Sequence, residues 1–221
     1  PVKVALRETV SKLGTGHGRH VKQSGGHGQY AVCDIEVQPL PEGSGFEFVD
    51  KVVGGSVPRQ FIPSIEIGVQ DYLKQGPMGF PVVDVAVRVT DGSYHTVDSS
   101  DMAFRQAGRI AMQEGLPQCS PVLLEPIMAV DITVPSDATP KINAMISQRR
   151  GQILGFDGRE GWDGWDVVSA QIPAAEMDDL IVELRSATAG VGTFSARFDH
   201  LAELTGRLAD QVLASHKEAA E

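Results

Sequence analysis

The sequence predicts an α+β protein made of two domains and a C-terminal helix. Segments rich in Val, Ile and Phe alternate apolar with polar residues, as strands do. Other segments repeat apolar residues at helical spacing and end at Gly or Pro. The 221 residues, 42% of them hydrophobic, are enough to build the cores of two ordinary domains.

The first domain, residues 1–121, is expected to follow the order β-β-β-α-β-α. Its strands are predicted at 2–10, 30–37, 46–50 and 82–89, and its helices at 62–75 and 101–114. Ser99 or Ser100 is expected to cap the second helix. The Asp91-Gly92 pair is a turn signal and is expected to end the preceding strand. Residues 14–28 are expected to form a long loop, because this glycine-rich stretch has little to bury.

The second domain, residues 122–201, is predicted to follow the order β-α-β-β-α-β of a ferredoxin-like fold. Its strands are expected at 124–134, 152–158, 166–172 and 193–198, and its helices at 140–150 and 174–185. Residues 202–221 read as an amphipathic helix with Leu204, Leu208 and Val212 on one face. We expect this helix to pack back on the first domain or on the junction.

Charge and composition exclude several classes of protein. The net charge of -10 argues against a protein that coats nucleic acid, and we expect no DNA partner. No apolar run approaches the roughly 20 residues of a membrane span, so we expect a cytoplasmic protein without a membrane partner. Cys33 and Cys119 occur singly and read as reduced packing thiols. His17, His20 and His27 lack a carboxylate or thiol at ligand spacing, so we expect no metal site.

The glycine-rich segment is the first candidate site. It offers glycine flexibility and polar groups suited to phosphate, ribose and base edges. The candidate RNA-binding residues are Arg19, His20, Lys22, Gln23, Ser24, Gly25 and Gly26. A flexible surface loop without a ligand is the alternative. The Gly-x-x-x-x-Gly-Lys-Ser/Thr pattern of a P-loop is absent from the sequence, so we expect neither GTP binding nor catalysis by these residues.

Two further pairs are candidates for contact with RNA. Tyr94 and His95 lie near an expected turn, where they could stack on or hydrogen-bond to an exposed base. A surface histidine without a special role is the alternative. Arg149 and Arg150 stand at an expected helix end, where they either complement the helix dipole or bind RNA phosphate.

Many ordered blocks resemble the fourth and fifth domains of elongation factor G. The blocks include Val4-Ala5-Leu6-Arg7-Glu8-Thr9, Lys22-Gln23-Ser24-Gly25-Gly26, Gly28-Gln29-Tyr30, Tyr94-His95, Val97-Asp98-Ser99-Ser100, Arg149-Arg150-Gly151 and Phe198-Asp199-His200. The resemblance implies a ribosomal protein S5 domain 2-like fold, with an unusual left-handed crossover, for the first domain. It implies a ferredoxin-like fold for the second.

The resemblance also implies a function. The first domain would reach the decoding centre of the small ribosomal subunit and contact the tRNA-mRNA duplex, and the second would face the large subunit. Residues 23–26 would form one tip loop and His95 would lie on the other. His95 matches the position that becomes diphthamide in archaeal and eukaryotic counterparts. The resemblance implies a GTPase parent, with GTP and Mg²⁺ bound by amino-terminal domains outside these residues.

The family resemblance leaves alternatives open. Residues 178–183 depart from the Phe-Gly-Tyr-Ala-Thr that the family commonly has before Leu-Arg-Ser, which favours a paralogue specialised in ribosome recycling or ribosome protection. A small-molecule kinase on an S5-like fold is a remote alternative, because the phosphate loop of such kinases leads into a helix whereas this segment leads into a strand.

Overall fold

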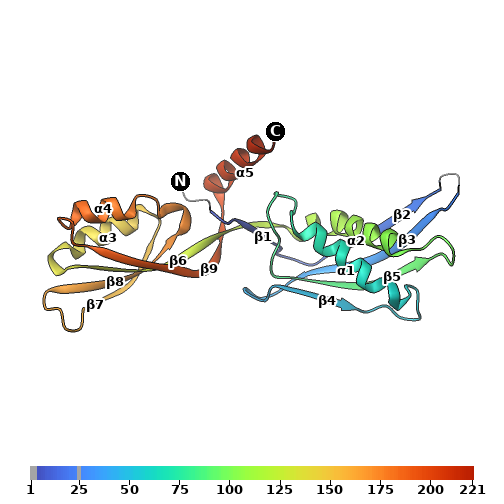
Figure 1. Cartoon of the computed structure of the whole chain (residues 1–221), viewed down its shortest axis with the longest axis horizontal. Helices are drawn as coiled ribbons and strands as arrows, with labels where there is room; N and C mark the ends of the chain where they lie inside the picture. Colours follow the sequence, from blue (N-terminus) through green and yellow to red (C-terminus); the bar gives the residue numbers. More distant parts are fainter. Residues whose placement is uncertain (1–3, 24–25) are drawn as a thin grey trace. The chain divides into compact units, whose positions relative to one another are not determined.

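The computed structural model describes residues 4–23 and 26–221. The chain forms two compact units (Figure 1). The first unit consists of Arg7–Leu124 and Leu204–Glu221, and the second consists of Glu125–Glu203 with residues 4–6. Each unit is a mixed sheet-and-helix structure with its own hydrophobic core, in agreement with the predicted α+β class.

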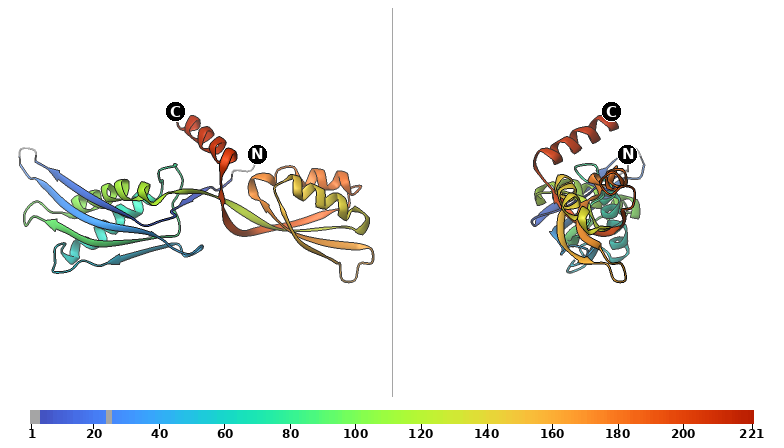
Figure 2. Two further views of the ribbon diagram at one scale, coloured as in Figure 1. Left: turned by 180° about the vertical axis from the view of Figure 1, so that it is seen from behind. Right: turned by 90° about the vertical axis from the view of Figure 1, so that its left-hand side faces the viewer.

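The first unit is built on a four-stranded sheet of order β2-β3-β5-β4. Its elements are β1 (Arg7–Thr9), β2 (Gly14–Lys22), β3 (Gln29–Pro39), β4 (Phe46–Asp50), α1 (Ile62–Leu73), β5 (Val85–Tyr94) and α2 (Asp101–Gly115). Neighbouring strands are antiparallel except β4 and β5, which run parallel because α1 connects them. Both helices lie on the same side of the sheet (Figures 1 and 2), and Phe104 of α2 is fully buried against this side.

The prediction of a loop over residues 14–28 is wrong for Gly14–Lys22, which form strand β2. Gly14, Gly16 and Gly18 alternate on the face that α2 covers. A Cβ atom on Gly16 or Gly18 would collide with the carbonyl oxygen of Ala111 or Ala107 in that helix. The glycines are therefore required for close packing of a helix on a strand, and they leave no hydrophobic pattern from which a strand is recognised.

The expected turn at Asp91-Gly92 is also wrong, since β5 continues through both residues to Tyr94. Asp91 pairs with Asp34 and Gly92 pairs with Cys33 on β3. The pairing register shifts just before this point, which is the mark of a β-bulge. With this bulge, the Asp91-Gly92 pair remains inside β5, and the strand continues to Tyr94.

The second unit has the ferredoxin-like order that the sequence predicts. Its elements are β6 (Val122–Pro135), α3 (Thr139–Gln148), β7 (Gln152–Gly158), β8 (Trp165–Pro173), α4 (Leu180–Ala187) and β9 (Thr193–Leu204). The first residues of β6 pair with β1, and the remainder pairs with β8 and β9. Ile142, Ile172 and Leu184 are fully buried between the helices and the sheet.

Two boundaries in the later part of the chain differ from expectation. The helix expected at 174–185 is a short 3₁₀ turn, Ala174–Glu176, followed by α4, because Asp179 adopts a left-handed backbone conformation with φ of 62°. The helix expected from residue 202 is α5 (Gly206–Ala220), because β9 continues to Leu204. Within the described residues, no helix combines the length and the apolar composition needed to cross a membrane.

Helix α5 contacts the remainder of the first unit through His216. The imidazole ring of His216 lies 4.3 Å from the ring of Phe80, centroid to centroid, and its Nε2 would be 2.6 Å from a Cβ added at Gly79. Ala209 is buried, whereas Leu208 is 40% exposed. The packing face of α5 is therefore rotated away from the face that the sequence pattern predicts.

Candidate nucleic-acid interface

The end of β2, the start of β3 and the segment between β5 and α2 lie at the same end of the sheet of the first unit (Figures 1 and 2). Strand β2 ends at Lys22, β3 begins at Gln29, and residues 95–100 connect β5 to α2. The backbone N–H of Tyr30, at the start of β3, donates to the carbonyl oxygen of Asp98 at 2.9 Å. The Ser99 hydroxyl donates to the carbonyl oxygen of Tyr30 at 2.6 Å. These bonds join the start of β3 to the segment between β5 and α2. We call this end of the unit, residues 19–23, 26–30 and 94–100, the tip.

The side chain of His95 organises the turn between β5 and α2. Its Nδ1 accepts the backbone N–H groups of Val97 at 3.2 Å and Asp98 at 3.1 Å. In the neutral ring the proton therefore lies on Nε2. The side chain is 52% exposed, so the ring is held by its inner nitrogen while much of its surface faces solvent. The backbone N–H of His95 also donates to the Ser99 hydroxyl oxygen at 2.9 Å.

The tip also carries two tyrosines, Tyr30 beside His95 in space and Tyr94 beside it in sequence. The ring centroid of Tyr30 lies 6.3 Å from that of His95, and the Tyr30 hydroxyl hydrogen-bonds to the Ser93 hydroxyl at 2.8 Å. Tyr94 is 46% exposed. Exposed or half-exposed rings beside a polar ring nitrogen can stack on an unpaired base or lie against ribose.

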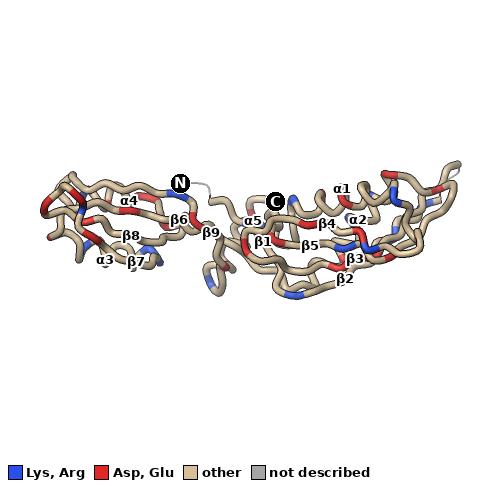
Figure 3. The backbone as a smooth tube through the Cα atoms, turned by 90° about the horizontal axis from the view of Figure 1, so that it is seen from below, with Lys and Arg blue, Asp and Glu red and all other residues tan. Residues whose placement is uncertain are grey.

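Basic and neutral polar residues stand on the β2 side of the tip. Arg19, Lys22 and Gln23 are all exposed. Gly26 has φ of 150° and is exposed. Ser24 and Gly25 lie outside the described residues. Figure 3 shows acidic and basic residues interleaved along the chain, whose net charge is -10.

The structure does not bring His20 together with the other candidates. His20 continues the alternation of Gly14, Gly16 and Gly18 and lies on the face that α2 covers, with 7% exposure. Its Nε2 hydrogen-bonds to the side-chain oxygen of Gln29 at 2.6 Å. In this position the imidazole ties β2 to β3 and does not face solvent beside Lys22.

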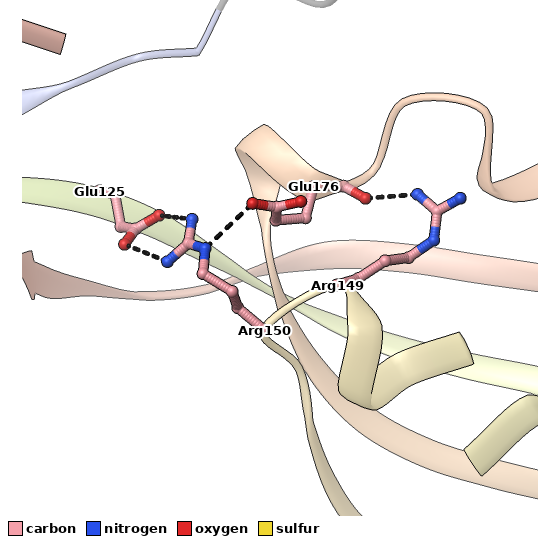
Figure 4. A network of polar contacts seen from close by, with 4 residues as sticks. All are labelled: Glu125, Arg149, Arg150 and Glu176. Carbon is pink, nitrogen blue, oxygen red and sulfur yellow. Dashed lines mark hydrogen bonds and ion pairs between the residues drawn. The ribbon is translucent and has the colours of Figure 1, made fainter. Parts of the chain in front are cut away.

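Arg149 and Arg150 lie in the second unit and have partners within it (Figure 4). Arg150 forms two hydrogen bonds with the carboxylate of Glu125, at 2.9 and 3.1 Å, and a third with Glu176. These carboxylates raise the pKa of the Arg150 guanidinium. Arg149 donates to the carbonyl oxygens of Glu176 and Asp178. Binding of RNA phosphate by either residue stays a prediction and would require it to exchange these partners.

Replacement of Arg150 by methionine should lower the free energy of unfolding of the second unit by about 1–2 kcal/mol. The Glu125 side chain is only 5% exposed and would lose its bidentate partner, which leaves a poorly solvated carboxylate. Chemical denaturation of the wild type and the variant measures the effect. The double variant Arg150→Met with Glu125→Gln should recover most of the loss, and an equal loss in both variants would contradict this role.

Sequence reasoning misses the residues that hold the tip together. The expectation that Ser99 or Ser100 caps α2 is confirmed for Ser100, which accepts the N–H of Ala103 at 3.1 Å. The bonds of Asp98 and Ser99 to Tyr30 are not indicated by any sequence pattern. Gly28 reads as a flexible loop residue, but a Cβ there would lie 2.8 Å from the Asp98 carboxylate. One sequence signal could have indicated this role: Asp98, Ser99 and Ser100 precede α2, and one helix cap needs only one of these polar side chains.

Comparison with known proteins identifies both units. The family model for elongation factor G, domain IV, matches residues 2–120, and the model for the elongation factor G C-terminus matches residues 122–212. A crystal structure of a Thermus thermophilus protein matches with a TM-score of 0.90 and 35% identity, over 98% of this chain and 32% of that one.

Three curated relatives match most of the chain. An elongation factor G-like protein of Synechocystis is 51% identical over 94% of this chain and 31% of the relative. An elongation factor G-like protein of Mycobacterium tuberculosis is 50% identical over 89% of this chain and 28% of the relative. The elongation factor G of Aquifex pyrophilus is 45% identical over 96% of this chain and 30% of the relative. The chain thus spans about a third of the length of these relatives.

Proposed function

The chain belongs to the elongation factor G family, and we propose that it is the ribosome-engaging part of a translational GTPase. This part would promote movement of the tRNA-mRNA duplex. The tip of the first unit would contact the duplex in the decoding centre of the small subunit. The second unit would face the large subunit. Nucleotide hydrolysis would be carried out by other domains of the same factor.

The observation that carries this proposal is the geometry of His95. Its ring is fixed through Nδ1 by two backbone N–H groups, which leaves Nε2–H oriented as a donor on a half-exposed side chain. A donor held by the backbone loses little conformational entropy when it binds. Such a group can bind a phosphate or ribose oxygen of a passing duplex without reading a base.

The chemistry of the tip suits a duplex of arbitrary sequence. The described tip residues offer a ring N–H, amide and hydroxyl groups, and the cations Arg19 and Lys22. Base-specific readout of double-stranded RNA is disfavoured because its major groove is deep and narrow, so shape and backbone contacts dominate. A factor that moves every codon requires recognition of this kind.

Replacement of Lys22 by alanine should weaken binding of the chain to ribosomes and should reduce the dependence of the affinity on salt. Loss of one phosphate contact lowers the slope of log affinity against log salt concentration by about one. Ribosome binding measured across a salt series tests this. Lys12→Ala is the matched control, because this exposed lysine precedes β2 at the opposite end of the strand. Equal losses in both variants would mean that the tip is not where phosphate is bound.

A second candidate function is favoured by the names of two relatives. The Synechocystis and Mycobacterium tuberculosis proteins are called elongation factor G-like, and both are at least 50% identical to this chain. A paralogue specialised in ribosome recycling or ribosome protection would use the same fold. A chimera in which this chain replaces the matching part of an elongation factor G separates the two functions. Translocation activity supports the first, and subunit splitting without translocation supports the second.

A further inference from the structure

Strand β7 of the second unit carries apolar side chains on an open edge. It ends the sheet order β1-β6-β8-β7, and among residues 4–23 and 26–221 its backbone pairs with β8 alone. Leu154 and Phe156 on this strand are 60% and 58% exposed. An edge strand presents unpaired N–H and C=O groups that can pair with another chain. The register shift between Ile153 and Gly155 interrupts the edge once, and the strand continues regularly to Gly158.

The hairpin that follows β7 holds an exposed aromatic cluster. The indole of Trp162 is 46% exposed, and the Arg159 guanidinium lies 3.5 Å from its ring centroid. The Trp165 ring meets Trp162 nearly perpendicularly at 5.1 Å. The backbone N–H of Arg159 donates to the carbonyl oxygen of Trp165 at 2.8 Å. These contacts fix the aromatic surface at the end of the open edge.

The end of β7 and its hairpin also carry acidic side chains. Asp157, Glu160 and Asp163 are exposed, whereas Arg159, the one Lys or Arg within residues 152–166, is stacked on Trp162. The charge therefore disfavours RNA, whose phosphates would be repelled. It favours a cationic partner, because complementary charge steers encounter and fixes register.

We propose that the β7 edge and its hairpin form a docking surface for an extended protein segment rich in Lys and Arg, which adds to the sheet as a strand beside β7. Main-chain hydrogen bonds to β7 supply affinity, and alternate side chains of the segment supply specificity. Leu154, Phe156 and Trp162 receive its apolar side chains, while the three exposed acids pair with its cations. This surface lies on the second unit and does not depend on the tip.

The two tryptophans of the protein, Trp162 and Trp165, both lie on this hairpin, so intrinsic fluorescence reports on the surface directly. The chain is titrated with a ten-residue peptide of alternating Val and Lys. A saturable fluorescence change is expected. A peptide with Glu in place of Lys should cause none. A basic peptide with two Val positions replaced by Pro should bind at least about tenfold more weakly, because Pro cannot donate to the ladder.

Variants test whether the named side chains are responsible. Phe156→Ser and Asp163→Lys should each weaken binding of the basic peptide several-fold, and Asp210→Lys on α5 should not. Equal binding of the proline-containing peptide would overturn strand addition. A fluorescence response to an oligouridine instead of the peptide would overturn the choice of a protein partner. Self-association of the chain that is abolished by Phe156→Ser would assign the edge to a second copy.

Discussion

Replacing Gly18 by alanine is expected to lower the free energy of unfolding of the first unit by about 3 kcal/mol, because the added methyl group would overlap the main chain of α2. The Cβ would collide with the carbonyl oxygen of Ala107, and a backbone atom of a packed helix cannot rotate away as a side chain can. Either β2 or α2 must shift. Since α2 also packs on β3 and α1, a shift of this helix would disturb the whole core of the unit.

Thermal and chemical denaturation of the first unit measure this effect, and a drop of roughly 10 °C in its melting temperature is expected. Gly155→Ala is the matched control. Gly155 is also a strand glycine, in β7, but a Cβ added there would meet no atom within 4 Å. Equal stability of the Gly18 variant and the wild type would contradict the close packing of α2 on β2.

The elements that could be predicted from the sequence are those with a strong hydrophobic pattern. Strands β4 and β7 have the predicted bounds, and α1 and α2 begin at the predicted residues. Strand β2 could not be recognised, because its packing face is made of glycine and its apolar contacts come from α2. The extension of β5 through Asp91-Gly92 depends on pairing with β3, which local turn propensity does not reveal.

The candidate site could be predicted in outline only. The exposure of His95, Tyr94 and Lys22 agrees with the position expected for tip residues, but contact with RNA stays a prediction for all of them. His20 is buried because it follows Gly14, Gly16 and Gly18 on the side of β2 that α2 covers. The prediction of a loop over residues 14–28 does not reveal this alternation. The ion pairs of Arg150 join residues far apart in sequence, and no local pattern indicates such partners.

Replacing His95 by alanine in the elongation factor G chimera is expected to slow translocation about tenfold to a hundredfold, the effect of losing roughly 1.4–2.7 kcal/mol of interaction with the moving duplex. The rate of GTP hydrolysis should stay within about twofold, because this tip carries no nucleotide-binding motif. Thr96→Ala is the matched control, since Thr96 is an exposed neighbour in the same turn.

Two conservative variants separate the roles of the two ring nitrogens. Asparagine places a side-chain oxygen near the position of Nδ1, where it can accept the N–H groups of Val97 and Asp98, but it lacks the outward donor. Glutamine reaches nearer to the position of Nε2 with an amide donor. His95→Asn should therefore keep the turn ordered and still translocate slowly, whereas His95→Gln should recover part of the rate.

Single-turnover translocation, followed beside GTP hydrolysis in the same reaction, tests the proposed role of the tip most directly. Slow translocation with normal hydrolysis in His95→Ala and His95→Asn, and wild-type rates in Thr96→Ala, is the result expected if the outward donor of His95 acts on the tRNA-mRNA duplex. Translocation at the wild-type rate in His95→Ala would contradict it.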